Sequence, residues 1–176
     1  MDRMDYIKSF VMKTVPLKGD IAEAGVWKGV SAEAICEVKG NKNLYLFDTF
    51  TGLPESMFTP VDTETEFNKQ YLEPNAYSGS LDEVKERLEG YENIQYYKGL
   101  IPDTFKGLKR KRYCFIHLDL DLYKSTLEAL KYFLPKRVKG GIIMIHNYHD
   151  FKGVRLAIRE MGITDELEGD HKYCIV

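Results

Sequence analysis

Residues 21–31, Ile-Ala-Glu-Ala-Gly-Val-Trp-Lys-Gly-Val-Ser, decide how the rest of the chain is interpreted. They predict the end of a buried strand, a tight turn with two glycines, and the start of a helix. Gly25 and Gly29 lack a Cβ atom, so the backbone can turn sharply and a ligand can lie close against it. The free N–H groups and the positive dipole end of the following helix would point at that ligand.

Two polar side chains of this stretch indicate what such a ligand carries. Ser31 can donate its hydroxyl hydrogen to a carboxylate, and Glu23 can accept from an ammonium group. This pair suits a zwitterionic amino-acid group better than a pyrophosphate. The spacing Glu-x-Gly-x-x-x-Gly also differs from the Gly-x-Gly-x-x-Gly of dinucleotide-binding folds, which disfavours a nicotinamide oxidoreductase. A plain strand–turn–helix connection without a ligand is the alternative.

A second signal follows about one strand and one helix later. Residues 44–48, Leu-Tyr-Leu-Phe-Asp, form a short apolar run that ends in an acid. In nucleotide-binding α/β sheets, an acid at the tip of the second strand accepts hydrogen bonds from ribose hydroxyls. A glycine turn followed by Asp48 therefore implies a cofactor that contains adenosine.

Length and composition restrict the class of protein. The 176 residues suit one domain, 1–176, and the net charge of −2 gives no broad basic face, so nucleic acid is not an expected partner. The basic run at 106–112 is interpreted as a solvated loop. Cys36, Cys114 and Cys174 are widely spaced in apolar patterns, which indicates buried reduced thiols. Without a signal peptide or a long apolar run, we expect a cytoplasmic protein with no membrane partner.

Hydrophobic periodicity along the chain predicts helices alternating with five short strands. That alternation is typical of a doubly wound α/β fold with a mostly parallel sheet, here closed by a C-terminal antiparallel hairpin over 163–176. The expected strands are 21–24, 44–47, 94–97, 113–118 and 142–145. The expected helices are 2–14, 31–38, 81–88, 125–133 and 153–161, with a short turn of helix at 101–107.

Residues 49–80 do not fit this alternation. They contain several prolines and glycines together with five aromatic residues, and such long irregular segments are usually functional or disordered. The aromatic content argues against disorder, so we interpret this segment as a lid over the site, with a helical piece near 64–72. A surface insertion without a functional role is the alternative. A capping box at Ser80 and Glu83 marks the start of the next helix.

Polar residues follow several of the predicted strands, and ligands bind beyond the carboxyl ends of such strands. Asp119 follows the fourth strand, and His146 and Asn147 follow the fifth. A carboxylate, an imidazole and an amide oxygen could bind a divalent cation that polarises a substrate hydroxyl. Alternatively, His146 or His149 is a general base that needs no metal, or these residues have only a structural role.

Together these segments resemble the class I S-adenosylmethionine-dependent methyltransferases, and most closely the macrocin O-methyltransferase (TylF-like) family. The resemblance covers most of the chain and depends on six segments that occur in order. They are EAGVWKGVS at 23–31, LFDTFTGLP at 46–54, KGLIPDTF at 98–105, HLDLDLY at 117–123, GGIIMI at 140–145 and GVRLA at 153–157.

The resemblance implies a set of cofactor-binding residues. Glu23, Gly25 and Ser31 would hold the methionine part of S-adenosylmethionine, with Trp27 and Gly29 in the same turn. In addition, Asp48 would bind the ribose, and Ser80 and Gly99 would lie near the adenine.

The resemblance also implies a magnesium ion, held by an acid after the fourth strand and an Asp-Asp or Asp-Asn pair after the fifth. Asp119 matches the first position, whereas His146-Asn147 replaces the pair. The imidazole shifts the expected preference from Mg²⁺ toward Mn²⁺ or similar ions, or indicates a site without metal.

The expected function is therefore methyl transfer from S-adenosylmethionine to a hydroxyl of a small molecule such as a sugar or a phenol. Asp119, His146 and Asn147 would position or activate that hydroxyl. The alternative is a methyltransferase-like module that binds the cofactor without catalysis and assists a partner protein. Aromatic residues in the lid and first helix are compatible with a homodimer.

Overall fold

A six-stranded sheet forms the centre of the computed structural model, which describes residues 2–163 and 173–176. The strand order is β3-β2-β1-β4-β5-β6, and β6 alone among these strands runs antiparallel to its neighbour. This confirms the predicted doubly wound, mostly parallel sheet, and the order reverses between β1 and β4, where such folds bind ligands. The strands are β1 (Asp20–Ala24), β2 (Leu44–Asp48), β3 (Ile94–Lys98), β4 (Tyr113–Leu118), β5 (Arg137–His146) and β6 (Tyr173–Ile175).

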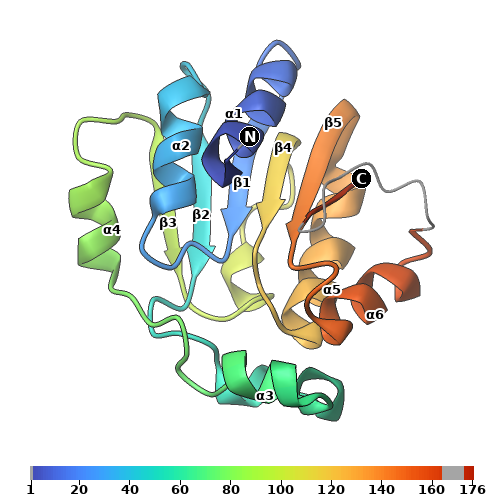
Figure 1. Cartoon of the computed structure of the whole chain (residues 1–176). Coiled ribbons are helices and arrows are strands. Elements are labelled where there is room, and N and C mark those ends of the chain that lie inside the picture. The colour runs from blue at the N-terminus through green and yellow to red at the C-terminus, as the bar shows by residue number, and fades with distance from the viewer. Residues whose placement is uncertain (1, 164–172) are drawn as a thin grey trace.

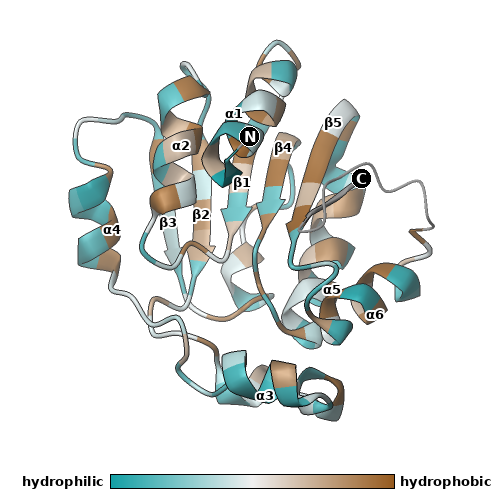
Figure 2. Ribbon diagram, in the orientation of Figure 1, coloured by the Kyte–Doolittle hydropathy of each residue, from teal (hydrophilic) through white to brown (hydrophobic). Residues whose placement is uncertain are grey.

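Alternate residues of the central strands enter two separate hydrophobic cores, as the two-residue period of a strand requires. Tyr45 and Phe47 of β2 face one core, whereas Leu44 and Leu46 face the other. The first core lies against α5 (Tyr123–Phe133) and α6 (Lys152–Glu160). The second lies against α1 (Arg3–Thr14), α2 (Val30–Val38) and α4 (Leu81–Arg87). The sheet is therefore covered by helices on both faces (Figure 1), and β5 in particular carries a run of apolar residues (Figure 2).

The segment 49–80 lies beyond the carboxyl ends of the parallel strands, at the lower end of the molecule in Figure 1. It contains two 3₁₀ turns, η1 (Glu55–Met57) and η2 (Pro60–Thr63), and the helix α3 (Glu66–Tyr71). The helical piece predicted near 64–72 is therefore present. The predicted capping box is confirmed as well, because Ser80 and Glu83 exchange hydrogen bonds at the start of α4.

The prediction for β5 was too short, because the strand begins at Arg137 rather than at residue 142. The predicted strand leaves out Gly140 and Gly141, since paired glycines are typical of a turn. Gly140 has a positive φ of 77°, and the register between β4 and β5 shifts along this part of the strand. The two glycines therefore accommodate an irregularity inside the strand instead of ending it.

Two further predictions concern the ends of elements. α5 begins at Tyr123, two positions before the predicted start. Residues 164–172 of the predicted C-terminal hairpin over 163–176 lie outside the described residues, although β6 does pair antiparallel with β5. In the part of the chain that the structure describes, no helix is both long and apolar enough to cross a bilayer.

Candidate active site

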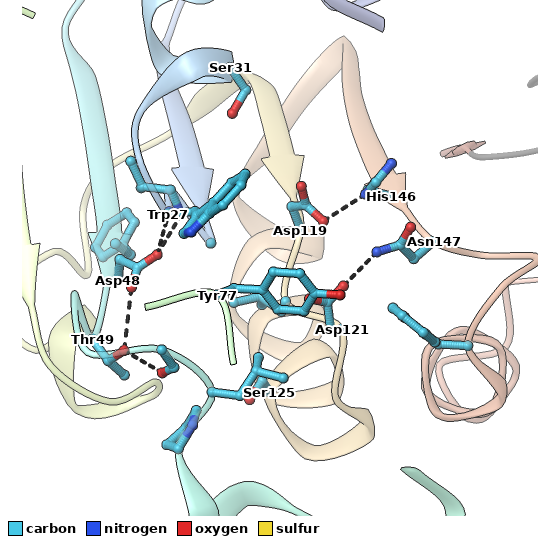
Figure 3. A pocket seen from close by; sticks show the side chains of 18 of the residues that line it. Trp27, Ser31, Asp48, Thr49, Tyr77, Asp119, Asp121, Ser125, His146 and Asn147 are labelled. Atoms are coloured by element: carbon cyan, nitrogen blue, oxygen red, sulfur yellow. Dashed lines mark hydrogen bonds and ion pairs between the residues drawn. The ribbon is translucent and has the colours of Figure 1, made fainter. Parts of the chain in front are cut away.

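A cavity of about 430 Å³ opens between the carboxyl ends of the strands and the segment 49–80. Figure 3 shows side chains from β1, β2, β4, β5 and their following loops converging on it. Most residues that the sequence predicted to be functional line this cavity. They are Gly25, Trp27, Ser31, Asp48, Gly99, Asp119, His146 and Asn147.

The turn after β1 can be built only with glycine at its first position. Gly25 has a φ of +85°, and a Cβ atom there would lie 1.8 Å from the backbone oxygen of Asp119. The loop after β4 therefore packs directly against the bare backbone of this turn. As a result, a ligand in the turn lies next to Asp119.

Asp48 holds the turn in place from the end of β2. Its Oδ2 accepts hydrogen bonds from the backbone N–H groups of Val26, at 2.6 Å, and Trp27, at 2.9 Å. Its Oδ1 accepts from the Phe50 N–H at 2.7 Å. One carboxylate thus joins the glycine turn to the start of the segment 49–80. The predicted contact with a ribose stays a prediction.

Trp27 connects the same turn to the far end of that segment. Its indole Nε1–H donates to the backbone oxygen of Ser78 at 3.2 Å, and its ring meets Tyr77 edge to face (Figure 3). The residue has a positive φ of 51° and its side chain is about half exposed, at 45%. The sequence offered no signal for this connection, because its partners lie about fifty positions away.

Three of the predicted cofactor-binding residues do not line the cavity: Glu23, Gly29 and Ser80. Glu23 is fully buried and contacts Nδ1 of His117, its register partner on β4, at 2.7 Å. A direct contact of Glu23 with a ligand therefore stays a prediction, and this arrangement does not favour it. Gly29 and Ser80 instead occupy the N-caps of α2 and α4.

Asp119 is held by two basic groups at the centre of the cavity. His146 Nδ1 lies 2.7 Å from its Oδ1, and the Arg3 guanidinium forms an ion pair with its Oδ2. Burial alone would raise the pKa of Asp119, but the charges of His146 and Arg3 outweigh it and lower that pKa. Asp119 is therefore an anion that can orient a cationic or hydroxylated ligand. The predicted proximity of Asp119 and His146 is confirmed (Figure 3).

Asn147 contacts a different acid, Asp121, which the sequence places at the same rim of the sheet but to which no catalytic or metal-binding role was assigned. Its Nδ2 donates to Asp121 Oδ1 at 2.6 Å, and both residues have positive φ angles, of 58° and 61°. Burial, followed by the nearby charge of Asp119, raises the pKa of Asp121 to about 7. The signal for Asp121 was its spacing two positions after Asp119 in the segment 117–123. The alternative base His149 is exposed and is not among the described residues that line the cavity.

A comparison with known protein families identifies the family to which a chain with this cavity belongs. The macrocin-O-methyltransferase (TylF) family matches residues 1–172. The chain belongs to this family. It is accordingly an O-methyltransferase that uses S-adenosylmethionine, and the predicted resemblance is confirmed.

Two curated proteins with similar sequences are both named as O-methyltransferases. One is the 8-demethyl-8-(2,3-dimethoxy-alpha-L-rhamnosyl)-tetracenomycin-C 4'-O-methyltransferase of Streptomyces olivaceus, 27% identical over 95% of this chain and 68% of that protein. The other is the demethyldecarbamoylnovobiocin O-methyltransferase of Streptomyces niveus, 24% identical over 92% of this chain and 65% of that protein. The chain thus spans about two thirds of the length of these relatives.

Solved structures share the fold. The O-methyltransferase NovP superposes with a TM-score of 0.82 at 21% identity, covering 98% of this chain and 78% of NovP. The calicheamicin methyltransferase CalS11 superposes with a TM-score of 0.76 at 18% identity, covering 98% of this chain and 77% of CalS11. At these identities the likeness shows that this member of the family shares their fold.

The predicted divalent cation does not fit the donor atoms of this family member. Both oxygens of Asp119 already contact basic groups, His146 turns Nδ1 toward that carboxylate, and Asn147 presents its amide N–H₂ to Asp121. Among the described residues, no group of three or more His, Cys, Asp or Glu side chains could hold a metal ion. The Mg²⁺ or Mn²⁺ ion stays a prediction, and the mechanism below takes no step through it.

Proposed function

We propose that this macrocin-O-methyltransferase family member methylates a hydroxyl of a small neutral acceptor, either a sugar or a phenol. The observation that carries the proposal is the cavity itself. It joins a glycine turn suited to the cofactor with a pair of aspartates suited to a hydroxyl group, and aromatic side chains of the segment 49–80 line it.

The cofactor part of the cavity lies along the turn after β1. Ser31, in the first turn of α2, and the N–H groups of that helix favour the methionine carboxylate. Asp119 is an anion that lines the same cavity, and its backbone packs against Gly25, which suits the ammonium group and the sulfonium charge. Asp48 lies in the same cavity at the end of β2, where an acid accepts from ribose hydroxyls.

The acceptor part lies between Asp121 and the aromatic residues. Phe67, Tyr71 and Tyr77 of the segment 49–80 and Phe151 before α6 line the cavity there. Aromatic faces pack well against the apolar faces of sugar rings and against other aromatic rings. The names of both curated relatives give small molecules as substrates of O-methylation, and the tetracenomycin substrate of one relative carries a dimethoxy-rhamnosyl group. A glycoside or a phenolic compound is therefore the proposed acceptor class.

The reaction is an in-line displacement at the methyl carbon of the sulfonium. A C–O bond forms to the acceptor, the C–S bond breaks, and S-adenosylhomocysteine leaves with the electron pair of that bond. The acceptor O–H loses its proton to the Asp121 carboxylate, which Asn147 orients, while Asp119 and His146 position the hydroxyl. Most of the acceleration then comes from alignment of the two substrates, since no enzyme-bound intermediate is needed.

Binding and turnover test this proposal separately. Trp27 is the one tryptophan in the chain and lines the cavity, so its fluorescence should change on titration with S-adenosylhomocysteine. A set of glycosides and phenols is then incubated with methyl-labelled S-adenosylmethionine, with and without EDTA and with added Mg²⁺ or Mn²⁺. Label transfer to an acceptor hydroxyl supports the proposal, and loss of transfer in EDTA would restore the predicted cation.

The predicted alternative, a cofactor-binding module without catalysis, depends on the departure of His146-Asn147 from the Asp-Asp or Asp-Asn pair, and membership in a family of O-methyltransferases counts against it. Tight binding of S-adenosylhomocysteine without methylation of any acceptor would favour it. The predicted homodimer and the predicted cytoplasmic location stay predictions. Analytical ultracentrifugation of the purified chain tests the homodimer.

A further inference from the structure

We propose that Arg3 binds the carboxylate of the cofactor's methionine part, and that Asp119 holds the Arg3 guanidinium in position before the cofactor enters. The inference depends on the proposed cofactor site and adds to it a residue that the sequence analysis did not consider.

Arg3 comes to the cavity from the other end of the chain. It is the first residue of α1, and its guanidinium reaches Asp119, 116 positions later in the sequence. Ile7, Phe10 and Val11 bury α1 in the core beside α2, so a packed helix fixes the place of Arg3. Arg3 lines the cavity together with Gly25 and Ser31, the residues where the amino-acid part of the cofactor is expected.

The charge of the cavity gives Arg3 its role. Among the cavity-lining residues that the structure describes, Arg3 is the only lysine or arginine, whereas four are aspartates: Asp48, Asp119, Asp121 and Asp150. A carboxylate that enters this acidic cavity needs a cation to offset the repulsion. The planar guanidinium can bind a carboxylate through two parallel hydrogen bonds, so it is the group suited to this task.

Cofactor binding then becomes an exchange of partners. A methionine zwitterion carries both an ammonium and a carboxylate, and the Arg3–Asp119 pair presents the complementary charges side by side. When the zwitterion enters, Arg3 turns to the carboxylate and Asp119 Oδ2 accepts from the ammonium. One ion pair is replaced by two, while the contact between Asp119 Oδ1 and His146 is kept. The side chains of Arg3 and Asp119 are 39% and 18% exposed, so an incoming ligand can reach both.

The experiment compares two ligands that differ in the carboxylate. S-adenosylhomocysteine and decarboxylated S-adenosylhomocysteine are titrated calorimetrically into the wild-type chain, Arg3→Ala and Arg3→Lys. Arg3→Ala should weaken S-adenosylhomocysteine binding about 10- to 100-fold, because a charge-assisted contact is lost. The same change should not weaken binding of the decarboxylated ligand, because this ligand has no carboxylate for Arg3 and its ammonium group still finds Asp119 as an acceptor. The S-adenosylhomocysteine affinity of Arg3→Lys should lie between those of the wild type and Arg3→Ala. Lysine keeps the positive charge but cannot form the bidentate contact with a carboxylate.

Lys8→Ala is the matched control, because Lys8 lies on the same helix and forms an ion pair with Glu37 away from the cavity. It should bind both ligands as the wild type does. Equal losses for both ligands in Arg3→Ala, or unchanged S-adenosylhomocysteine affinity, would overturn the role of Arg3. Absence of S-adenosylhomocysteine binding by the wild type would instead overturn the proposed function.

Discussion

At the scale of single residues, Asp121 contributes a pH dependence that can be worked out from its surroundings. Burial raises its pKa from 3.8 to about 7, and the charge of Asp119 acts in the same direction. At pH values between these two pKa values, Asp121 is still protonated in the folded chain, whereas in the unfolded chain it has lost its proton. The stability contribution of Asp121 is therefore complete below about pH 4 and is lost as the pH rises to about 7.

Asp121→Asn should remove this dependence, because an amide does not titrate and still offers Asn147 an acceptor oxygen. The melting temperature of the variant should exceed that of the wild type at pH 8, and the difference should shrink at pH 5. Thermal unfolding of both proteins at the two pH values measures this, and titrating groups that do not interact with Asp121 cancel in the comparison. A difference that is the same at both pH values would contradict the shifted pKa.

Asp48 allows a second prediction at this scale. Asp48→Ala leaves the N–H groups of Val26, Trp27 and Phe50 without their acceptor and also removes the predicted ribose contact. We expect S-adenosylhomocysteine affinity, followed by calorimetry, to fall more than about tenfold. Asp103→Ala, which removes an exposed acid paired only locally with Lys106, is the control and should bind normally. Unchanged affinity in Asp48→Ala would remove Asp48 from the cofactor site.

The sequence could predict those site residues that follow strands. Asp119 and His146 are 27 positions apart, yet they lie at the carboxyl ends of two neighbouring parallel strands, which meet at one edge of the sheet. Arg3 could not be predicted in this way, because its place depends on how α1 packs across the sheet. The contact of buried Glu23 with His117 could not be predicted either, because it depends on the register between β1 and β4.

At the scale of elements, the segment 49–80 is fastened to the rest of the fold by one buried acid. Asp62 is fully buried, and its Oδ1 accepts from the N–H of Tyr123, the first residue of α5, at 2.8 Å. Its Oδ2 accepts from the N–H and hydroxyl of Thr59. A Cβ atom on Gly153 of α6 would lie 2.3 Å from Asp62 Oδ1, so only glycine leaves room for the acid. Three segments therefore meet at Asp62.

Asp62→Ala should loosen the segment 49–80, because buried N–H donors of two segments lose their acceptor. We expect a loss of about 2–3 kcal/mol in the free energy of unfolding and faster proteolytic cleavage within 49–80. Glu64→Ala is the matched control, since Glu64 links the same segment to α6 through an exposed ion pair with Lys152. Exposed pairs contribute at most about 1 kcal/mol. Equal effects of the two substitutions would contradict the role given to Asp62.

Element prediction succeeded where local periodicity decides the structure. The alternation of Leu44, Tyr45, Leu46 and Phe47 between two cores is visible as an uninterrupted apolar run typical of a buried parallel strand. The conformation inside 49–80 depends on contacts such as Asp62 with Tyr123, 61 positions away, which no local pattern contains. The length of β5 was missed for a different reason: glycines at a strand irregularity resemble glycines at a turn.

At the scale of the whole molecule, the cavity joins all these elements, so its ligand should stabilise the entire fold. The turn after β1, the segment 49–80, α1 and the ends of β4 and β5 all contribute lining residues, and a ligand that binds them favours the folded state by mass action. At a ligand concentration of 100 times Kd the gain is about 2.7 kcal/mol. For a domain of this size that corresponds to a rise in melting temperature of roughly 5–10 °C.

Thermal unfolding with and without S-adenosylhomocysteine measures this gain, and the choice of ligand makes the result specific. Adenosine keeps only the nucleoside, so it can reach Asp48 and the adenine region but leaves Arg3, Ser31 and Asp119 without the zwitterion. Because α1 and the ends of β4 and β5 are engaged only by the amino-acid part, adenosine at the same concentration should raise the melting temperature by less than half as much. An equal rise for the two ligands would mean that cofactor binding is confined to the β1–β2 side of the sheet, and that α1 contributes nothing to it.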